Sequence, residues 1–377
     1  MKRVYLDNAA TTPISKEIIE LMSSLMKHQF ANPSSTHSEG RKSKTIVEES
    51  RTIIAKILNT YPRNIFFTSG GTESDNMAIK MSIENYNIKH AITSRISHHA
   101  VLYPLEKLAK ENKIKLSYVK LDKNGLVSFS DLENLLKNNS RTFVSIMHAN
   151  NEVGVIQDIK KIGLICQNYN AIFHSDTVQT IGHYQIDLQK INIDFLAASA
   201  HKFHGPKGIG FIYISDNVKI SPFIIGGAQE RNMRAGTENI HSISALAKAM
   251  QLAYENLDND MTYIKKLKSY MIEKLKLDIP DVQFFSNSND LDNSLYTVLT
   301  VSFPLTKNSE MLLFNLDIAG VSCSGGSACA SGSNKGSHVL SYFDPNAKRT
   351  GIRFSFSKYN TFEDIDFTIQ KLKDIFN

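Results

Sequence analysis

The chain alternates short runs of β-branched and aromatic residues with stretches whose apolar residues recur at helical spacing. This alternation limits the fold more than any other feature. The strand-like runs are residues 65–68, 90–93, 115–119, 142–147, 171–174 and 195–198. Helical patterns or polar connections separate most of them, for example at 159–168. Strand and helix in alternation predict an α/β fold with a mostly parallel sheet and helices on both faces.

Two regions flank this alternation. Before it, apolar residues at helical spacing predict a helix at 16–27 and a second one that includes 46–57. After it, the run 208–214 follows the last strand too closely for an intervening helix, so we expect it to be an antiparallel neighbour. A further helix is expected at 243–257.

Beyond residue 257 the pattern changes. The polar segment 258–260 is expected to end the preceding helix, and a lysine-rich helix and strand-like runs at 295–303 and 351–355 follow it. At about 150 residues per domain, a chain of 377 residues has room for two domains. We therefore predict a large domain at 15–257, and a smaller α+β domain formed by 1–14 and 258–377.

Composition excludes several classes of protein. Hydrophobic residues make up 42% and charged residues 21%, as in globular proteins rather than disordered chains or collagen. No apolar run approaches the roughly 18 residues of a membrane helix, and no secretion signal is apparent. We therefore expect no membrane as partner. The net charge is +6, and the basic residues form no arginine-rich stripe, so we expect no nucleic acid as partner either. Three cysteines cannot form a disulfide framework, which indicates a reducing compartment, the cytoplasm.

Polar residues gather where the predicted strands end. Five such segments are 68–74, 97–99, 148–152, 174–179 and 199–208. Ligands of parallel α/β sheets bind outside the carboxyl ends of the strands. We therefore expect these segments to converge on one cleft.

Three of the segments contain residues suited to a phosphorylated cofactor. Gly70, Gly71 and Thr72 open a helix and offer backbone N–H groups and a hydroxyl to a phosphate. Lys202, at the end of an apolar strand, is costly to bury unless its amine is neutral or covalently used, as in a Schiff base. Asp176, on the adjacent predicted strand, could pair with the pyridinium nitrogen of pyridoxal phosphate.

The residues alone leave structural interpretations open. The Gly-Gly-Thr turn is also typical of a helix cap, a lone lysine at a strand end is more often structural, and Asp176 could cap a following helix. No Gly-Lys-Ser/Thr or Gly-x-Gly-x-x-Gly pattern is present at these turns, which disfavours the corresponding nucleotide folds. The paired His98 and His99 lack a second ligand pair at metal spacing, so no metal is expected.

Several motifs resemble those of cysteine desulfurases. They are DNAATTP at 7–13, NPSSTH at 32–37, TSGGTESDN at 68–76, MHANNEVG at 147–154, RAGT at 234–237 and GSAC at 326–329. The resemblance extends to RFS at 353–355 and includes the segments around Asp176 and Lys202. Other pyridoxal-phosphate enzymes of this fold share the aspartate and lysine but not the cysteine loop. The Gly-Ser-Ala-Cys form resembles the subgroup that serves iron–sulfur cluster assembly. Gly71, Ala200 and Ala235 stand where the family frequently has Ala, Gly and Ser.

The resemblance implies the fold of type I pyridoxal-phosphate-dependent transferases, a homodimer, and roles for the matching residues. Lys202 would hold pyridoxal phosphate as a Schiff base and Asp176 would pair with the ring nitrogen. His98 would stack on the ring and act as a catalytic acid or base. Gln179 would hydrogen-bond the phenolic oxygen of the ring.

The remaining implied contacts concern the substrate and the phosphate. Arg353 would bind the substrate carboxylate, for which its planar fork is suited, and Asn151 would contact cofactor or substrate. The residues implied for the phosphate are Gly71, Thr72, Ser199 and His201, with Thr237 reaching in from a second subunit.

The three cysteines differ in their surroundings. Cys329 lies in the segment 322–337, which is dominated by Gly, Ser and Ala and predicts a mobile loop with a reactive thiol. Cys166 is expected to be a buried small hydrophobe on the 159–168 helix. Cys323 is expected to be structural, and a part in protecting or resolving a persulfide stays open.

We therefore expect a cysteine desulfurase that converts L-cysteine to L-alanine and takes the sulfur onto Cys329 as a persulfide. An iron–sulfur scaffold or another acceptor protein would receive it. No metal is expected in the isolated enzyme, although Cys329 could ligate a cluster shared with a scaffold. The alternatives are a selenocysteine lyase or other lyase or aminotransferase on the same scaffold, and a non-catalytic cysteine-relay or scaffold protein.

Overall fold

A seven-stranded sheet forms the centre of the larger part of the molecule. The computed structural model describes residues 2–137, 139, 141–219, 221–306, 311–325, 336–346 and 348–376. The strand order is β2 (Ile65–Thr68), β8 (Gly210–Ile214), β7 (Phe195–Ser199), β6 (Ile172–Asp176), β5 (Phe143–Ser145), β3 (His90–Thr93) and β4 (Lys115–Tyr118). From β7 to β4 all neighbours are parallel, whereas β8 is antiparallel to both β7 and β2. The mostly parallel sheet and the antiparallel run are thereby confirmed.

Alternate residues of these strands enter two separate cores, because successive side chains of a strand point to opposite faces. Phe143 and Phe195 pack in a core with residues of two helices, α3 (Gly71–Asn85) and α4 (His99–Lys110). Val144 and Leu196 pack in the other core. The helices contributing buried residues there are α1 (Lys16–His28), α2 (Ser38–Ile57), α5 (Phe129–Lys137), α6 (Ile159–Asn168) and α7 (Ile240–Glu255). The sheet thus has helices on both faces.

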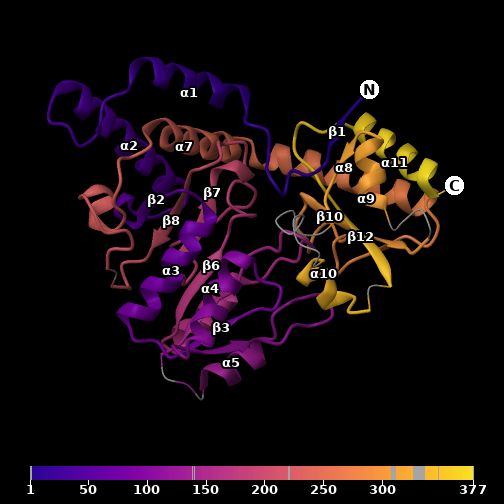
Figure 1. The fold of residues 1–377 in the computed structure, drawn as a ribbon, viewed down its shortest axis with the longest axis horizontal. Coiled ribbons are helices and arrows are strands. Elements are labelled where there is room, and N and C mark those ends of the chain that lie inside the picture. The colour runs from indigo at the N-terminus through magenta and orange to yellow at the C-terminus, as the bar shows by residue number, and fades with distance from the viewer. Residues whose placement is uncertain are drawn as a thin grey trace.

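A smaller sheet lies beside the large one (Figure 1). In it β10 (Val298–Pro304) pairs antiparallel with β12 (Arg349–Ser355) and β9 (Gln283–Phe284). A separate two-stranded sheet is formed by β1 (Val4–Tyr5) and β11 (Val321–Ser322), which are parallel. The helices of this part are α8 (Leu257–Asp278), α9 (Leu312–Ile318), α10 (His338–Phe343) and α11 (Phe362–Phe376). Short 3-10 helices lie at Pro62–Asn64, Ala200–Lys202 and Gln229–Asn232. Val4 and Leu6, near the N-terminus, pack in the same core as residues of α8, β10 and β12. The division into domains at 1–14, 15–257 and 258–377 stays a prediction.

The expectation that the polar segment 258–260 ends the preceding helix is wrong. Helix α7 ends at Glu255, and α8 begins at Leu257, so the acidic segment is the first turn of α8. Asp258 and Asp260 are favourable there because carboxylates interact well with the positive end of the helix dipole.

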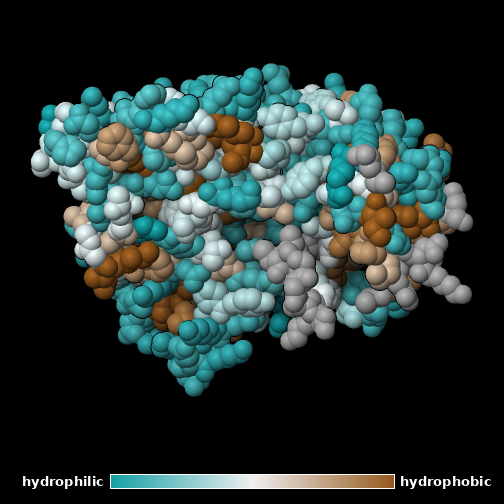
Figure 2. All heavy atoms as spheres, turned by 45° about the horizontal axis from the view of Figure 1, so that its top comes forward, coloured by the Kyte–Doolittle hydropathy of each residue, from teal (hydrophilic) through white to brown (hydrophobic). Residues whose placement is uncertain are grey.

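The outer surface is mainly hydrophilic on the face shown in Figure 2, where hydrophobic residues form separate patches. In the described part of the chain, no helix combines the length and the apolar character required to cross a membrane.

Candidate active site

A cavity of about 200 Å³ lies at the carboxyl ends of the parallel strands. Most of the residues predicted from the sequence line it: Gly71, Thr72, His98, Asn151, Asp176, Gln179, Ser199, His201, Lys202 and Arg353. The expected convergence of the strand ends is therefore present.

Lys202 lies on the 3-10 helix Ala200–Lys202, directly after β7. Its Nζ donates to the carbonyl oxygens of Ala9 at 2.7 Å and Ala10 at 2.9 Å. Gln179 Nε2 also donates to the Ala9 carbonyl, at 3.1 Å. The DNAATTP segment thus forms one wall of the cavity and holds the lysine amine against it.

Asp176 ends β6, the parallel neighbour of β7, and therefore reaches the same edge of the sheet as Lys202. Its Oδ1 accepts a hydrogen bond from the backbone N–H of Val178 at 3.0 Å, and turns rather than a helix follow. Burial raises the pKa of Asp176, while neighbouring His98 and Lys202 oppose that rise. The carboxylate is thus placed deep in the cavity, with cationic or polar groups around it.

The start of α3 forms another wall. Gly70 has φ +151°, and a Cβ at Gly210 would lie 2.8 Å from the Gly70 Cα, so both positions favour glycine. The first N–H groups of a helix have no partner within it and point toward such a cavity wall. His201 lies nearby, where burial lowers its pKa to about 4 and keeps the imidazole neutral at neutral pH. Neutral N–H and hydroxyl donors of this kind suit a phosphate.

Arg353 enters the cavity from β12 of the smaller sheet and is 1% exposed. One terminal nitrogen lies 2.7 Å from Asp7 Oδ1, and the other donates to the Asn151 carbonyl at 2.9 Å. Its Nε has no hydrogen-bond partner among the described residues. Asp7 Oδ1 also accepts a hydrogen bond from Ser324 Oγ at 2.8 Å. A carboxylate ligand would meet a guanidinium already oriented by Asp7.

His98 is the N-cap of α4, and its Nδ1 accepts from the backbone N–H of Ala100 at 3.2 Å. This contact places the ring proton on Nε2. Burial lowers the pKa of His98. The ring therefore offers the N–H at Nε2 as a donor.

Two predicted residues do not line the cavity. Thr237 is exposed, and its contact from a second subunit stays a prediction. Cys329 lies in 326–335, the part of the predicted loop that is outside the described residues. Of the other cysteines, Cys166 is buried and Cys323 partly so, and burial raises the pKa of both thiols.

Sequence reasoning missed Asp75, a buried carboxyl that also lines the cavity. Its position within the TSGGTESDN motif was the one available signal. Sequence reasoning also missed Asp7 as the partner of Arg353. Asp7 lies in the DNAATTP motif, and a motif does not show which of its residues face the site.

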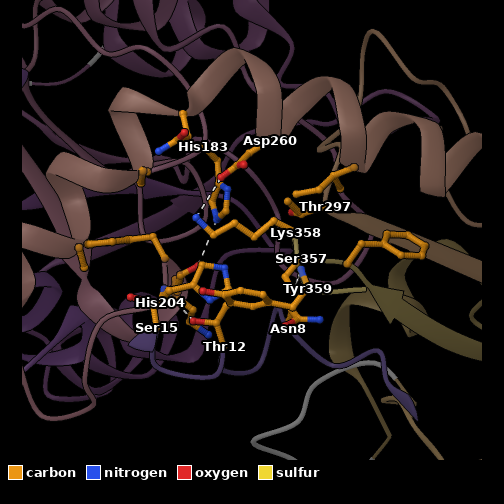
Figure 3. A pocket seen from close by; sticks show the side chains of 18 of the residues that line it. Asn8, Thr12, Ser15, His183, His204, Asp260, Thr297, Ser357, Lys358 and Tyr359 are labelled. Atoms are coloured by element: carbon orange, nitrogen blue, oxygen red, sulfur yellow. Dashed lines mark hydrogen bonds and ion pairs between the residues drawn. The ribbon is translucent and has the colours of Figure 1, made fainter. Parts of the chain in front are cut away.

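A second cavity, of about 310 Å³, shares Lys202 and Gln179 with the first among its lining residues. Figure 3 shows this second cavity. Lys358 and Asp260 form an ion pair of 3.3 Å within it, and His183 lies close by. The start of α3, Asp176 and Arg353 do not contribute to this cavity. The smaller cavity is therefore the better candidate for the predicted chemistry.

Comparisons with known proteins agree with this geometry. The family model described as aminotransferase class-V matches residues 4–367. The chain is 43% identical to "Cysteine desulfurase IscS" of Dictyoglomus turgidum, over all of this chain and 95% of that protein. Among solved structures, a "NIFS-like protein" has a TM-score of 0.90 and 36% identity, covering 99% of both chains. "SspA in complex with cysteine" has a TM-score of 0.81 and 31% identity, covering 95% of this chain and 99% of that one.

Proposed function

Because the chain belongs to the class-V aminotransferase family and is a cysteine desulfurase, we propose that Lys202 holds pyridoxal phosphate in the smaller cavity. We also propose that Cys329 receives the sulfur of L-cysteine as a persulfide. The observation that most supports the placement of pyridoxal phosphate is that Lys202, Asp176 and Arg353 reach one cavity from separate parts of the fold.

The residues around the cavity fit the cofactor. A buried carboxylate, Asp176, would face the ring nitrogen, and the N–H groups at the start of α3 with Thr72, Ser199 and His201 would hold the phosphate. Gln179 would hydrogen-bond the phenolic oxygen. When bound, pyridoxal phosphate withdraws electrons from the Cα of an attached amino acid.

Two side chains would act on the substrate directly. Arg353 would bind its carboxylate, and the Nε that lacks a partner among the described residues gives the guanidinium a free donor for this contact. His98 would transfer a proton at Nε2, the ring nitrogen that does not cap α4. Asn151, whose carbonyl positions Arg353, would contact cofactor or substrate.

The Cys329 thiolate would attack the sulfur of L-cysteine. A sulfur–sulfur bond forms as the carbon–sulfur bond of the substrate breaks, and the carbon keeps the electron pair and takes up a proton, giving alanine. The raised pKa values of Cys166 and Cys323 support this choice, because a protonated thiol is a poor nucleophile.

The wider role belongs to the same proposal. The names of the relatives support a place in iron–sulfur cluster assembly, so a scaffold or other acceptor protein would take the persulfide sulfur. A homodimer would bring Thr237 of a second copy to the phosphate. The two described cysteines are free thiols, which suits the cytoplasm.

The test is turnover of L-cysteine by protein loaded with pyridoxal phosphate. We expect Lys202→Ala to abolish alanine formation and the absorbance of the covalently held cofactor, while Lys266→Ala, an exposed lysine on α8, keeps both. Normal turnover by Lys202→Ala would contradict the assignment. Activity on L-selenocysteine but not on L-cysteine would favour the selenocysteine lyase instead.

A further inference from the structure

A buried polar chain that the proposed function does not use lies behind Asp176. It consists of Ser145 on β5, His174 on β6 and Asp75 on α3, each no more than 1% exposed. The Ser145 Oγ and His174 Nδ1 are hydrogen-bonded at 2.8 Å. His174 Nε2 is 3.2 Å from Asp75 Oδ1, but the two atoms are not aligned as a hydrogen bond, and neither has a hydrogen-bond partner among the described residues. Buried polar groups are costly, so such a chain calls for a reason.

The fold brings this chain to Asp176. His174 and Asp176 are two residues apart on β6, so their side chains point to the same face of the sheet, where α3 packs. Ser145 is the registered partner of His174 on β5. One side-chain ligand atom each from Asp75, Asp176 and His98 lie within 4.8 Å of one another.

Two carboxyls this close cannot both be ionised in a buried site, because like charges disfavour the second ionisation. Three titratable groups surround the two carboxyls. His98, at the start of α4, lies near both of them, His174 on β6 lies against Asp75, and Lys202 lies near Asp176. His98 and Lys202 act on Asp176 and favour its ionised form, whereas Asp75 gains no such support and burial raises its pKa well above the ordinary value. Burial also keeps His174 neutral by lowering its pKa to about 3.

We propose that Asp75 is a positioning residue that stands as a neutral carboxylic acid between His174 and Asp176, keeps the negative charge on Asp176 and holds that carboxylate in place. This inference rests on the proposed function, since Asp176 matters through the ring nitrogen of pyridoxal phosphate. Asp75 itself need not touch the substrate.

The experiment compares two substitutions with different charge consequences. Asn has the shape of a neutral aspartic acid, so we expect Asp75→Asn to bind pyridoxal phosphate within about threefold of the wild type and to keep the pH dependence of the bound cofactor's absorbance. Asp75→Ala removes the carboxyl that lies beside Asp176 and leaves His174 Nε2 facing an apolar side chain, so we expect its cofactor dissociation constant to rise by roughly tenfold. The dissociation constant is measured by absorbance titration of the apoprotein.

Asp194→Ala is the matched control. Asp194 is a half-buried carboxyl directly before β7, which accepts a hydrogen bond from the Phe173 backbone N–H at 2.9 Å, but it does not line the cavity. We expect it to leave the cofactor affinity unchanged even if it lowers stability. A loss as large in Asp75→Asn as in Asp75→Ala would show that Asp75 is ionised and overturn the inference, as would wild-type affinity in Asp75→Ala. Wild-type protein that binds no pyridoxal phosphate would instead overturn the proposed function.

Discussion

Two arginines on strand β12 show how strongly position decides the role of a residue. Arg353 is buried in the cavity wall against Asp7. Arg349, four residues earlier, donates to Asp281 Oδ2 at 2.8 Å and to Ser302 Oγ at 2.7 Å, away from the cavity. The same residue type thus lines the cavity in one case and joins neighbouring segments away from it in the other.

This pair provides a test of the substrate contact. Lysine keeps the charge but loses the planar fork, so we expect Arg353→Lys to raise KM for L-cysteine by roughly tenfold without changing cofactor content. Arg349→Lys should keep the wild-type KM. Steady-state kinetics with absorbance of the bound cofactor measures both. An unchanged KM in Arg353→Lys would mean that another residue binds the carboxylate.

At the scale of single residues, the sequence was informative where chemistry and position coincide. Lys202 and Asp176 could be singled out because each follows an apolar strand, and parallel strands bring such ends together. Asp75 and Asp7 could not, because nothing in a sequence separates a carboxyl that faces a cavity from one that faces water. Their partners, His174 and Arg353, are distant in the chain and meet them only in the fold.

At the scale of secondary-structure elements, strands were predicted better than helix boundaries. The runs at 65–68 and 90–93 coincide with β2 and β3 because every residue of these two short strands is buried, and such strands appear as short runs rich in apolar and β-branched residues. The boundary between α7 and α8 was missed because only Asn256 separates the two helices, and acidic residues are as typical of a helix start as of a loop.

Helix α8 contains an unusual buried lysine that makes its packing pH-dependent. Lys268 is fully buried, and its Nζ donates to Ser294 Oγ at 2.7 Å and to the Leu295 carbonyl at 3.0 Å. Burial lowers its pKa from 10.5 to about 7. Between these pH values the Lys268 side chain is protonated in the unfolded chain but neutral in the folded one. The free energy of unfolding therefore rises with pH across that window and falls as the pH is lowered toward 7.

We therefore expect Lys268→Met to flatten this rise, which in the wild type approaches about 1.4 kcal/mol per pH unit. The measurement is the free energy of unfolding in urea across the same pH window. Lys265→Met is the control, because Lys265 is only partly buried and pairs with Asp292 at 3.1 Å, so its slope should match the wild type. If Lys268→Met kept the wild-type slope, another group would be responsible.

At the scale of the whole molecule, the exposed surface near Thr237 suits contact with a second copy. Ile225 is 91% exposed and Ile224 37% exposed, in the segment between β8 and the exposed Thr237. Exposed apolar residues that adjoin one another are more typical of an interface than single ones, and Ile224 and Ile225 are adjacent. If that second copy supplies Thr237 to the phosphate, subunit contact and cofactor binding must be linked.

We expect Ile225→Asp to shift the protein toward monomer and to weaken pyridoxal-phosphate binding by roughly tenfold, because burying an unpaired charge opposes association. Leu277→Asp changes a residue that is 80% exposed at the end of α8 and should affect neither. Analytical ultracentrifugation and cofactor titration measure the two properties. A monomer with full cofactor affinity would refute the shared site.

The arrangement of the whole molecule was the least accessible from sequence patterns. Periodicity predicts a sheet and its helices, but not that Arg353 of the smaller sheet enters a cavity of the larger one. That expectation came from resemblance to a family. The expectation that Cys329 carries the sulfur also rests on that resemblance and on the composition of its segment, because Cys329 lies outside the described residues.

Transfer of labelled sulfur tests the central claim most directly. Wild-type protein, Cys329→Ser, Cys323→Ser and Cys166→Ser are incubated with sulfur-labelled L-cysteine, and the label is located by peptide mapping while alanine is measured. We expect the label on Cys329 in every protein that retains it. In Cys329→Ser the cofactor should stay bound, but alanine formation should fall by roughly a hundredfold or more, because a neutral hydroxyl is a far poorer nucleophile than a thiolate. Label on Cys323 or Cys166 of the wild type, or normal alanine formation by Cys329→Ser, would contradict the account.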